Sequence, residues 1–83
     1  MNRVISVKYL RDYLLELVFA DGHQKVVDIN PFIRDGLSYA LADLSYFQNV
    51  KIESGGGIYW PNGYDFCPNY LRDEVPAATF AHA

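Results

Sequence analysis

The sequence predicts a small α+β domain: an antiparallel three-stranded meander, short helices, a second β-hairpin and a short C-terminal helix, arranged in two layers. Apolar and polar residues alternate with period two over residues 5–9, which is typical of a half-buried strand, and residues 13–19 are apolar on nearly both faces, which is typical of a central strand. Residues 30–48 hold short helical runs separated by Pro, Gly, Ser and Asp, and residues 50–60 hold two strand-like runs around three glycines. We expect one domain over residues 1–75 and a disordered tail over residues 76–83.

Length and composition restrict the class of protein. The chain has 83 residues, of which 51% are hydrophobic and 20% are charged, as in a folded single domain. Aromatic residues make up 16%, and the formal net charge is −3. Because proteins that bind nucleic acid normally carry a basic face, this charge argues against nucleic acid as a partner.

The N-terminal residues, the apolar runs and the single cysteine bear on the cellular location. Residues 1–8 lack the apolar run of a secretory signal, and no stretch approaches the ~20 apolar residues that span a bilayer. The single cysteine, Cys67, cannot form an internal disulfide. We expect a cytoplasmic protein that does not enter a membrane and is stabilised by packing alone.

The first half of the chain predicts the meander. Residues 5–9 alternate apolar and polar side chains and predict its first strand. Residues 13–19 predict its second strand, in which Leu14 and Val18 make the second face apolar as well. A strand that is apolar on both faces is typical of a central position. The third strand ends at Asn30.

The turn at Asp21-Gly22 allows two registers for the second and third strands. A two-residue loop would place Leu15 opposite Asp28. A three-residue loop with Gly22 in the left-handed region and a bulge would place Leu15 opposite Val27. We favour the bulged turn, because it keeps the apolar residues of both strands on one face.

Short helices are expected after the third strand. Asn30 is a candidate N-cap and Pro31 suits the first helical position, so a single turn should follow. Ser38 could cap a second short helix over residues 39–42. Asp43 makes a further boundary possible, which leaves open whether this segment is one helix or two turns.

The last third predicts a second hairpin and a final helix. Residues 50–52 and 58–60 read as strands on either side of three glycines, which tolerate positive φ. Pro61-Asn62-Gly63 has the residue types of a tight turn. The last helix should begin at Pro68.

Several of these segments together resemble a known family. The most specific stretch is Trp60-Pro61-Asn62-Gly63-Tyr64-Asp65 followed by Pro68, and the Phe19-Ala20-Asp21-Gly22 turn adds to it. Over Val4 to Leu71 the chain is similar to the bacterial domain-of-unknown-function family 2442. This resemblance implies a small α+β domain and implies no activity, cofactor or catalytic residue.

Four residues near the second turn are candidates for a ligand or partner site: Trp60, Asn62, Tyr64 and Asp65. In the functional interpretation, Asp65 is a carboxylate at the mouth of a pocket beside Trp60 and Tyr64. In the structural interpretation, which we favour, Asp65 accepts hydrogen bonds at the start of the last helix and Trp60 fills the core.

No catalytic residue, metal or cofactor is predicted. Cys67 and His23 could form a nucleophile–base pair, but nothing in the sequence brings them together, and an inert cysteine is the favoured interpretation. The chain has no Cys-x-x-Cys, His-x-x-x-His or Asp-x-Asp pattern of a metal site. Residues 55–57 are not followed by the helix of a phosphate-binding loop, so they predict a turn.

Apolar surface on the first sheet is the remaining anomaly. Leu14 and Val18 lie next to Val4 and Val26 of the neighbouring strands, on a face that short helices cannot also cover. Exposed apolar patches often mark interaction sites. We therefore expect this face, or an open strand edge, to bind a second copy in a homodimer or a protein partner.

Two functions remain open from the sequence. The favoured one is a non-catalytic interaction or accessory module that acts through the apolar sheet face or a strand edge. The alternative is a small-ligand-binding or hydrolytic domain with a site around residues 60–65. The position of Asp65 discriminates between them, because a carboxylate that caps a helix is not free to act on a ligand.

Overall fold

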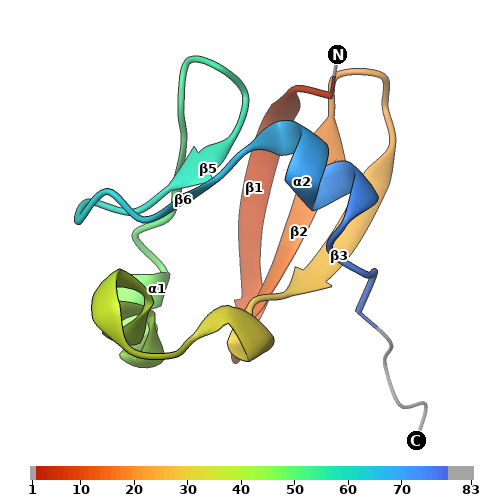
Figure 1. The fold of residues 1–83 in the computed structure, drawn as a ribbon. Helices are drawn as coiled ribbons and strands as arrows, with labels where there is room; N and C mark the ends of the chain where they lie inside the picture. The colour runs from red at the N-terminus through yellow and green to blue at the C-terminus, as the bar shows by residue number, and fades with distance from the viewer. Residues whose placement is uncertain (1, 79–83) are drawn as a thin grey trace, which may run out of the picture.

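The computed structural model describes residues 2–78 and has the predicted α+β fold (Figure 1). Three antiparallel strands form the first sheet, and three very short antiparallel strands form the second. Helical turns join the sheets, and a short helix follows the second sheet. In chain order the elements are β1 (Val4–Arg11), β2 (Leu14–Phe19), β3 (Gln24–Asp28), the 3₁₀ helices η1 (Asn30–Phe32) and η2 (Gly36–Ala42), α1 (Leu44–Phe47), β4 (Lys51–Ile52), β5 (Ile58–Tyr59), β6 (Asp65–Phe66) and α2 (Pro68–Asp73).

The turn between β2 and β3 sets the register of the first sheet. Leu15 lies opposite Val27, as predicted for the bulged turn. Gly22 has a φ of 91°, and the Phe19 N–H donates to the His23 carbonyl oxygen at 2.8 Å. Because side chains disfavour this φ, a glycine is needed where the turn reverses the chain. The predicted register is confirmed.

One face of the first sheet supplies much of the core. Leu15, Leu17 and Phe19 alternate along β2, and each has 0% of its surface exposed. Figure 1 shows α2 crossing in front of β2 and β3, with the second sheet on the other side of β1. The later part of the chain completes the core with Ile29, Leu41, Phe47, Ile58, Trp60, Phe66, Leu71 and Val75. The first sheet is therefore one layer, and the second sheet with the helices is the other.

The start of η1 differs from the prediction. Asn30 lies inside the 3₁₀ turn, and the N-cap position is Ile29, whose side chain cannot accept a hydrogen bond. The Asn30 N–H instead donates to Asp28 Oδ1 at 2.9 Å. An Asp two residues before a free N–H makes this bond readily, so Asp28 takes the role that we expected of Asn30. Pro31 lies in the first turn, as predicted.

Ser38 also has a different role from the one predicted. Because η2 begins at Gly36, Ser38 lies within the helix rather than before it. Its side chain is buried, and Oγ accepts from the Arg34 N–H at 3.0 Å and donates to the Asp35 carbonyl oxygen at 3.2 Å. Ser38 therefore joins the loop before η2 to the helix.

Asp43 divides the helical segment into two turns, which was one of the two alternatives. Its Oδ1 accepts from the Ser45 N–H at 3.0 Å and so caps α1. An N-cap carboxylate satisfies one of the backbone N–H groups that a helix start leaves without a partner. The chain consequently changes direction between η2 and α1.

The second sheet contains a strand that the sequence did not predict. β4 and β5 form the expected hairpin around Gly55–Gly57, and β6 adds to β5 with Asp65 opposite Tyr59. The backbone of β6 comes so close to the glycine loop that a Cβ on Gly57 would collide with the Phe66 carbonyl oxygen. A glycine is therefore required at this position by the approach of β6.

Residues 76–78 run beside β3. Ala77 forms an antiparallel bridge with Val27, and the Ala78 N–H donates to the Val26 carbonyl oxygen at 2.7 Å. The tail that we expected from Pro76 thus starts with backbone pairing. Its residues 79–83 lie outside the described part of the chain.

A polar clip joins the β2–β3 turn to α2. Arg72 donates to both carboxylate oxygens of Asp21, at 3.1 and 3.0 Å, and its guanidinium carbon lies 4.9 Å from the centre of the Phe19 ring. These hydrogen bonds lower the pKa of Asp21 from 3.8 to about 2. Lys25 Nζ donates to the Leu71 carbonyl oxygen at 2.9 Å, so a second cation holds the end of α2.

Candidate functional site

Trp60 lies in the core rather than at the surface. Its side chain is fully buried, and the indole Nε1–H donates to the Phe47 carbonyl oxygen at 2.9 Å. The indole also stacks on the Phe47 ring, with 5.7 Å between the ring centres. A buried indole needs a hydrogen-bond acceptor, and Phe47 supplies it. The core interpretation of Trp60 is confirmed.

Asn62 holds the β5–β6 turn against the helical segment. Its Nδ2 donates to the Leu37 carbonyl oxygen at 2.9 Å, and its backbone N–H donates to the Tyr46 hydroxyl at 2.9 Å. Its Oδ1 accepts from the Tyr64 N–H at 3.1 Å. These hydrogen bonds within the domain explain why an Asn occupies this position, and no bound ligand is needed for the explanation.

Tyr64 belongs to the aromatic packing around Trp60. Its ring centre lies 6.0 Å from that of Trp60 and 5.4 Å from that of Phe66, in an edge-to-face arrangement with Phe66. Burial raises the pKa of the Tyr64 hydroxyl, and the neighbouring Tyr70 and Asp65 add to this shift. Tyr64 is therefore a neutral, half-buried side chain rather than an activated phenol.

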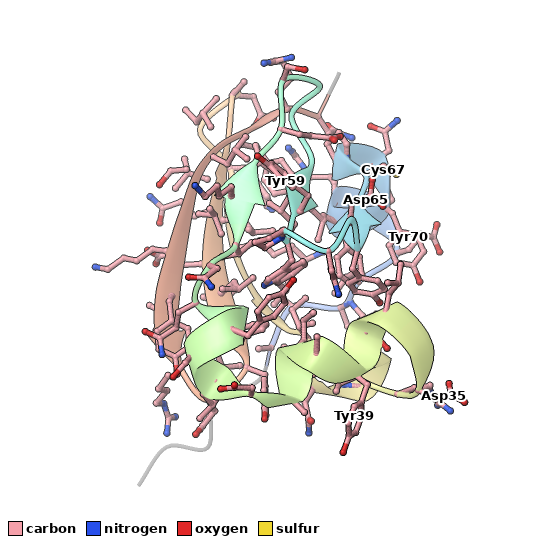
Figure 2. All side chains as sticks on the ribbon, turned by 90° about the vertical axis from the view of Figure 1, so that its left-hand side faces the viewer. Asp35, Tyr39, Tyr59, Asp65, Cys67 and Tyr70 are labelled. Carbon is pink, nitrogen blue, oxygen red and sulfur yellow. The ribbon has the colours of Figure 1, made fainter. Side chains whose placement is uncertain are left out.

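Asp65 does not cap the last helix, so that expectation was wrong. Cys67 occupies the N-cap position of α2, and the pairing of β6 with β5 holds Asp65 on the surface of the second sheet, opposite Tyr59. The side chain of Asp65 is exposed. Figure 2 shows Tyr59, Asp65 and Cys67 on the same side of the molecule. The four candidates thus divide between the core, the turn and the surface.

The residues with potential for catalysis or metal binding lie in separate places. His23 is in the β2–β3 turn with its ring centre 5.9 Å from that of Phe19, and Cys67 is exposed at the start of α2. Within residues 2–78, no group of three His, Cys, Asp or Glu side chains could hold a metal ion. In the same range, every helix is too short or too polar to cross a membrane.

The face of the first sheet that points away from the core carries apolar and charged side chains. We call this the outer face, and it consists of Ser6, Lys8, Arg11, Leu14, Glu16, Val18, Gln24, Val26 and Asp28. Its three apolar residues, Leu14, Val18 and Val26, are half-buried. Figure 2 shows β1 and β2 at one edge of the molecule, with α2 at the opposite edge.

Val4 does not share the outer face with these residues. It pairs with Phe19 on the core face, and only 1% of its surface is exposed. The register shifts by one residue at Ile5, between Val4 and Ser6. This bulge reverses the alternation that had placed Val4 outside, because an extra residue moves a side chain to the other face.

Charge varies across the outer face from one edge to the other. Lys8 and Arg11 lie on β1, Glu16 lies on β2 and Asp28 lies on β3. The register places Arg11, Leu14 and Asp28 in one row across the three strands. The basic side chains of this face therefore lie on β1 and its acidic side chains lie on β2 and β3, with Leu14, Val18 and Val26 among them.

A shallow hollow beside η2 and α1 was not predicted. It has a volume of about 490 Å³ and is lined by Tyr39, Ala40, Ala42, Asp43 and Tyr46. The sequence carried only a weak signal for it, namely two tyrosines and one acid in a short segment. These side chains meet because the chain turns at Asp43, and that turn was only one of two alternatives in the sequence.

Comparison with known proteins matches most of the chain to one family. The family model described as Protein of unknown function (DUF2442) matches residues 4–77. No curated protein and no solved structure gives a match. The matched range contains both sheets and all the helices described above.

Proposed function

The chain belongs to the DUF2442 family, and we propose that it is a non-catalytic interaction module whose outer face binds a second copy of the chain. The observation that carries this proposal is the row formed by Arg11, Leu14 and Asp28 across the three strands. When a second copy of this row is turned by 180°, the Arg11 of each copy faces the Asp28 of the other. The proposal includes a cytoplasmic location, which is supported by a single cysteine and hence no internal disulfide.

A twofold axis parallel to the strands would stack the two outer faces with β1 of one copy over β3 of the other. Packed sheets lie about 10 Å apart, a distance that an Arg and an Asp side chain can bridge together. Arg11 of each copy then lies over Asp28 of the other, and the two Leu14 side chains meet between these ion pairs. Such a contact uses the same surface on both copies, so it forms a dimer and does not extend to further copies.

Glu16 is disfavoured in this arrangement. It lies on the central strand, so each Glu16 would face its own copy near the axis, and like charges repel. Lys8 lies directly opposite Glu16 in the same sheet and offsets part of this repulsion. Replacement of Glu16 by Gln should therefore strengthen the association.

An open strand edge has less support than the outer face. Residues 77–78 already pair with the edge of β3. At β1, the Val4 N–H donates to the Gly56 carbonyl oxygen at 2.9 Å, and the register shifts at Ile5 and Leu10. Bulges and covered ends discourage the addition of another strand.

A ligand-binding or hydrolytic site around residues 60–65 also has less support. Trp60 and Asn62 are occupied by packing and by hydrogen bonds within the domain. Asp65 is exposed and does not cap α2, so it is free to accept from a ligand. The other ionisable side chain among residues 60–65 is that of Tyr64, and the raised pKa of its half-buried hydroxyl disfavours a role in general acid–base chemistry.

Sedimentation equilibrium at micromolar concentrations tests the proposed self-association. We expect a dimer for the unchanged chain. Arg11→Glu should raise the dissociation constant about tenfold or more, since it places like charges at both ends of the contact. Asp28→Asn should have a smaller effect in the same direction, because Asn keeps an acceptor for the Asn30 N–H.

Lys51→Glu provides the matched control, because it reverses an exposed charge on the second sheet and should leave the dimer unchanged. A monomer at every concentration would overturn the proposal. An equal loss of association in Lys51→Glu and Arg11→Glu would also overturn it, since it would show a dependence on net charge alone.

A further inference from the structure

The hollow beside η2 and α1 shares no residue with the outer face, although its Tyr46 also packs against the core. Tyr39, Ala40 and Ala42 come from η2, Asp43 joins the two helices, and Tyr46 comes from α1. Figure 2 shows these two helices side by side at one end of the molecule, with Tyr39 pointing away from the body.

The two tyrosines differ in how firmly they are held. Tyr46 is half-buried, and its hydroxyl accepts a hydrogen bond from the Asn62 N–H at 2.9 Å, which fixes the end of the ring. Tyr39 has 69% of its surface exposed. Leu37 and Leu44, which lie close to the lining residues in the sequence, have 58% and 39% of their surface exposed. The hollow thus offers one fixed ring and one exposed ring.

Asp43 supplies the charge of the hollow. Its Oδ1 is held by the Ser45 N–H, which fixes the plane of the carboxylate and leaves Oδ2 to accept from a ligand. The other lining residues are two alanines and two tyrosines, so no lining side chain is positively charged. A carboxylate beside aromatic rings and methyl groups attracts a cation that has an apolar stem.

We infer that this hollow binds an arginine side chain of a basic partner protein. The planar guanidinium donates to Asp43, and it can stack on a tyrosine ring at the same time. The aliphatic stem then lies on the methyl groups of Ala40 and Ala42. The net charge of −3 favours a basic partner over the whole surface. The inference does not rest on self-association, since the hollow shares no residue with the outer face.

A titration of ¹⁵N-labelled protein with N-acetyl-arginine amide tests this inference, with N-acetyl-citrulline amide as the neutral isostere. We expect saturable shifts of the backbone amides in residues 39–46 with the arginine probe at millimolar concentrations. The citrulline probe should bind about tenfold more weakly or not at all, because it lacks the charge.

Two variants and one control variant assign the binding to the hollow. Asp43→Asn removes the charge but keeps a side chain that caps α1 equally well, so it should abolish saturation with the arginine probe. Asp35→Asn is the matched control, because Asp35 is an exposed acid close to η2 that does not line the hollow. Tyr39→Ala should weaken binding and leave the fold intact, since Tyr39 is exposed.

Three outcomes would overturn the inference. They are equal binding of the citrulline probe, an equal loss of binding in Asp35→Asn and Asp43→Asn, and an absence of saturable shifts in residues 39–46 up to tens of millimolar of the arginine probe. None of these results bears on the oligomeric state, so the test is independent of the proposed dimer.

Discussion

The two sheets of the domain differ in what determines the positions of their strands. The strands of the first sheet have five to eight residues, and their alternating side chains give each strand a buried face. The strands of the second sheet have two residues each, too few for alternation to specify a register. Their positions depend on the close approach at Gly57 and on aromatic packing around Trp60. A long sheet can be specified by local pattern, whereas a short one needs contacts between distant residues.

Gly57→Ala should disrupt the second sheet and have the largest effect. The new Cβ would collide with the Phe66 carbonyl oxygen, and β6 cannot retreat without losing its pairing with β5. We expect the free energy of unfolding to fall by about 4 kcal/mol or more, measured by urea denaturation.

Gly55→Ala is the matched control for this substitution. A Cβ at Gly55 would lie 3.6 Å from Glu53 Oε1, an ordinary contact. The free energy of unfolding should therefore change by less than about 1 kcal/mol. Equal losses for the two variants would mean that the close approach does not hold the second sheet.

Leu15→Ala and Leu14→Ala compare the two faces of β2 and should have the next largest effect. Leu15 is fully buried, so its truncation should cost about 3 kcal/mol through lost burial and the cavity that remains. Leu14 is half-buried on the outer face and should cost about 1 kcal/mol when the chain is monomeric. Both free energies of unfolding are measured by urea denaturation at a low protein concentration, where the chain is monomeric. Similar losses in the two variants would contradict the assignment of Leu14 to the outer face.

The smallest effect is expected at the clip between the first sheet and α2. The pKa of Asp21 is about 2 in the folded chain and 3.8 ordinarily, so the clip stabilises the fold above pH 3.8. This contribution is lost as the pH falls toward 2. As the pH falls from 3.8 toward 2, the thermal midpoint of unfolding should therefore decrease more steeply in the unchanged chain than in Asp21→Asn. The difference should shrink at high salt, because Asp21 is exposed, and parallel curves would contradict the role of the clip.

The register of β2 and β3 was predictable from the sequence, whereas the second sheet was predictable only in part. Gly22 in the turn and the apolar face of β2 are local signals, and they were sufficient to predict the register between β2 and β3. β6 was missed because two residues before Cys67-Pro68 carry no periodicity. Asn30 and Ser38 were assigned as caps from their residue types, but each lies inside its helix, and Asp28 satisfies the Asn30 N–H.

The candidate site shows the same division between local and distant signals. Burial of Trp60 was predictable from its size in a domain without disulfides. The contacts of Asn62 were not predictable, because Leu37 and Tyr46 are 25 and 16 residues earlier in the chain. Val4 was misplaced by the bulge at Ile5, which adjacent sequence does not reveal.

The pairing of residues 77–78 with β3 provides a reporter of events on the first sheet. The Ala78 N–H donates to the Val26 carbonyl oxygen, and the side chain of Val26 belongs to the outer face. A molecule that covers this face would restrict the opening of the same strand. The hydrogen-exchange rate of this one amide should therefore slow on association, which allows binding to be followed on the unchanged chain without a label at the contact itself.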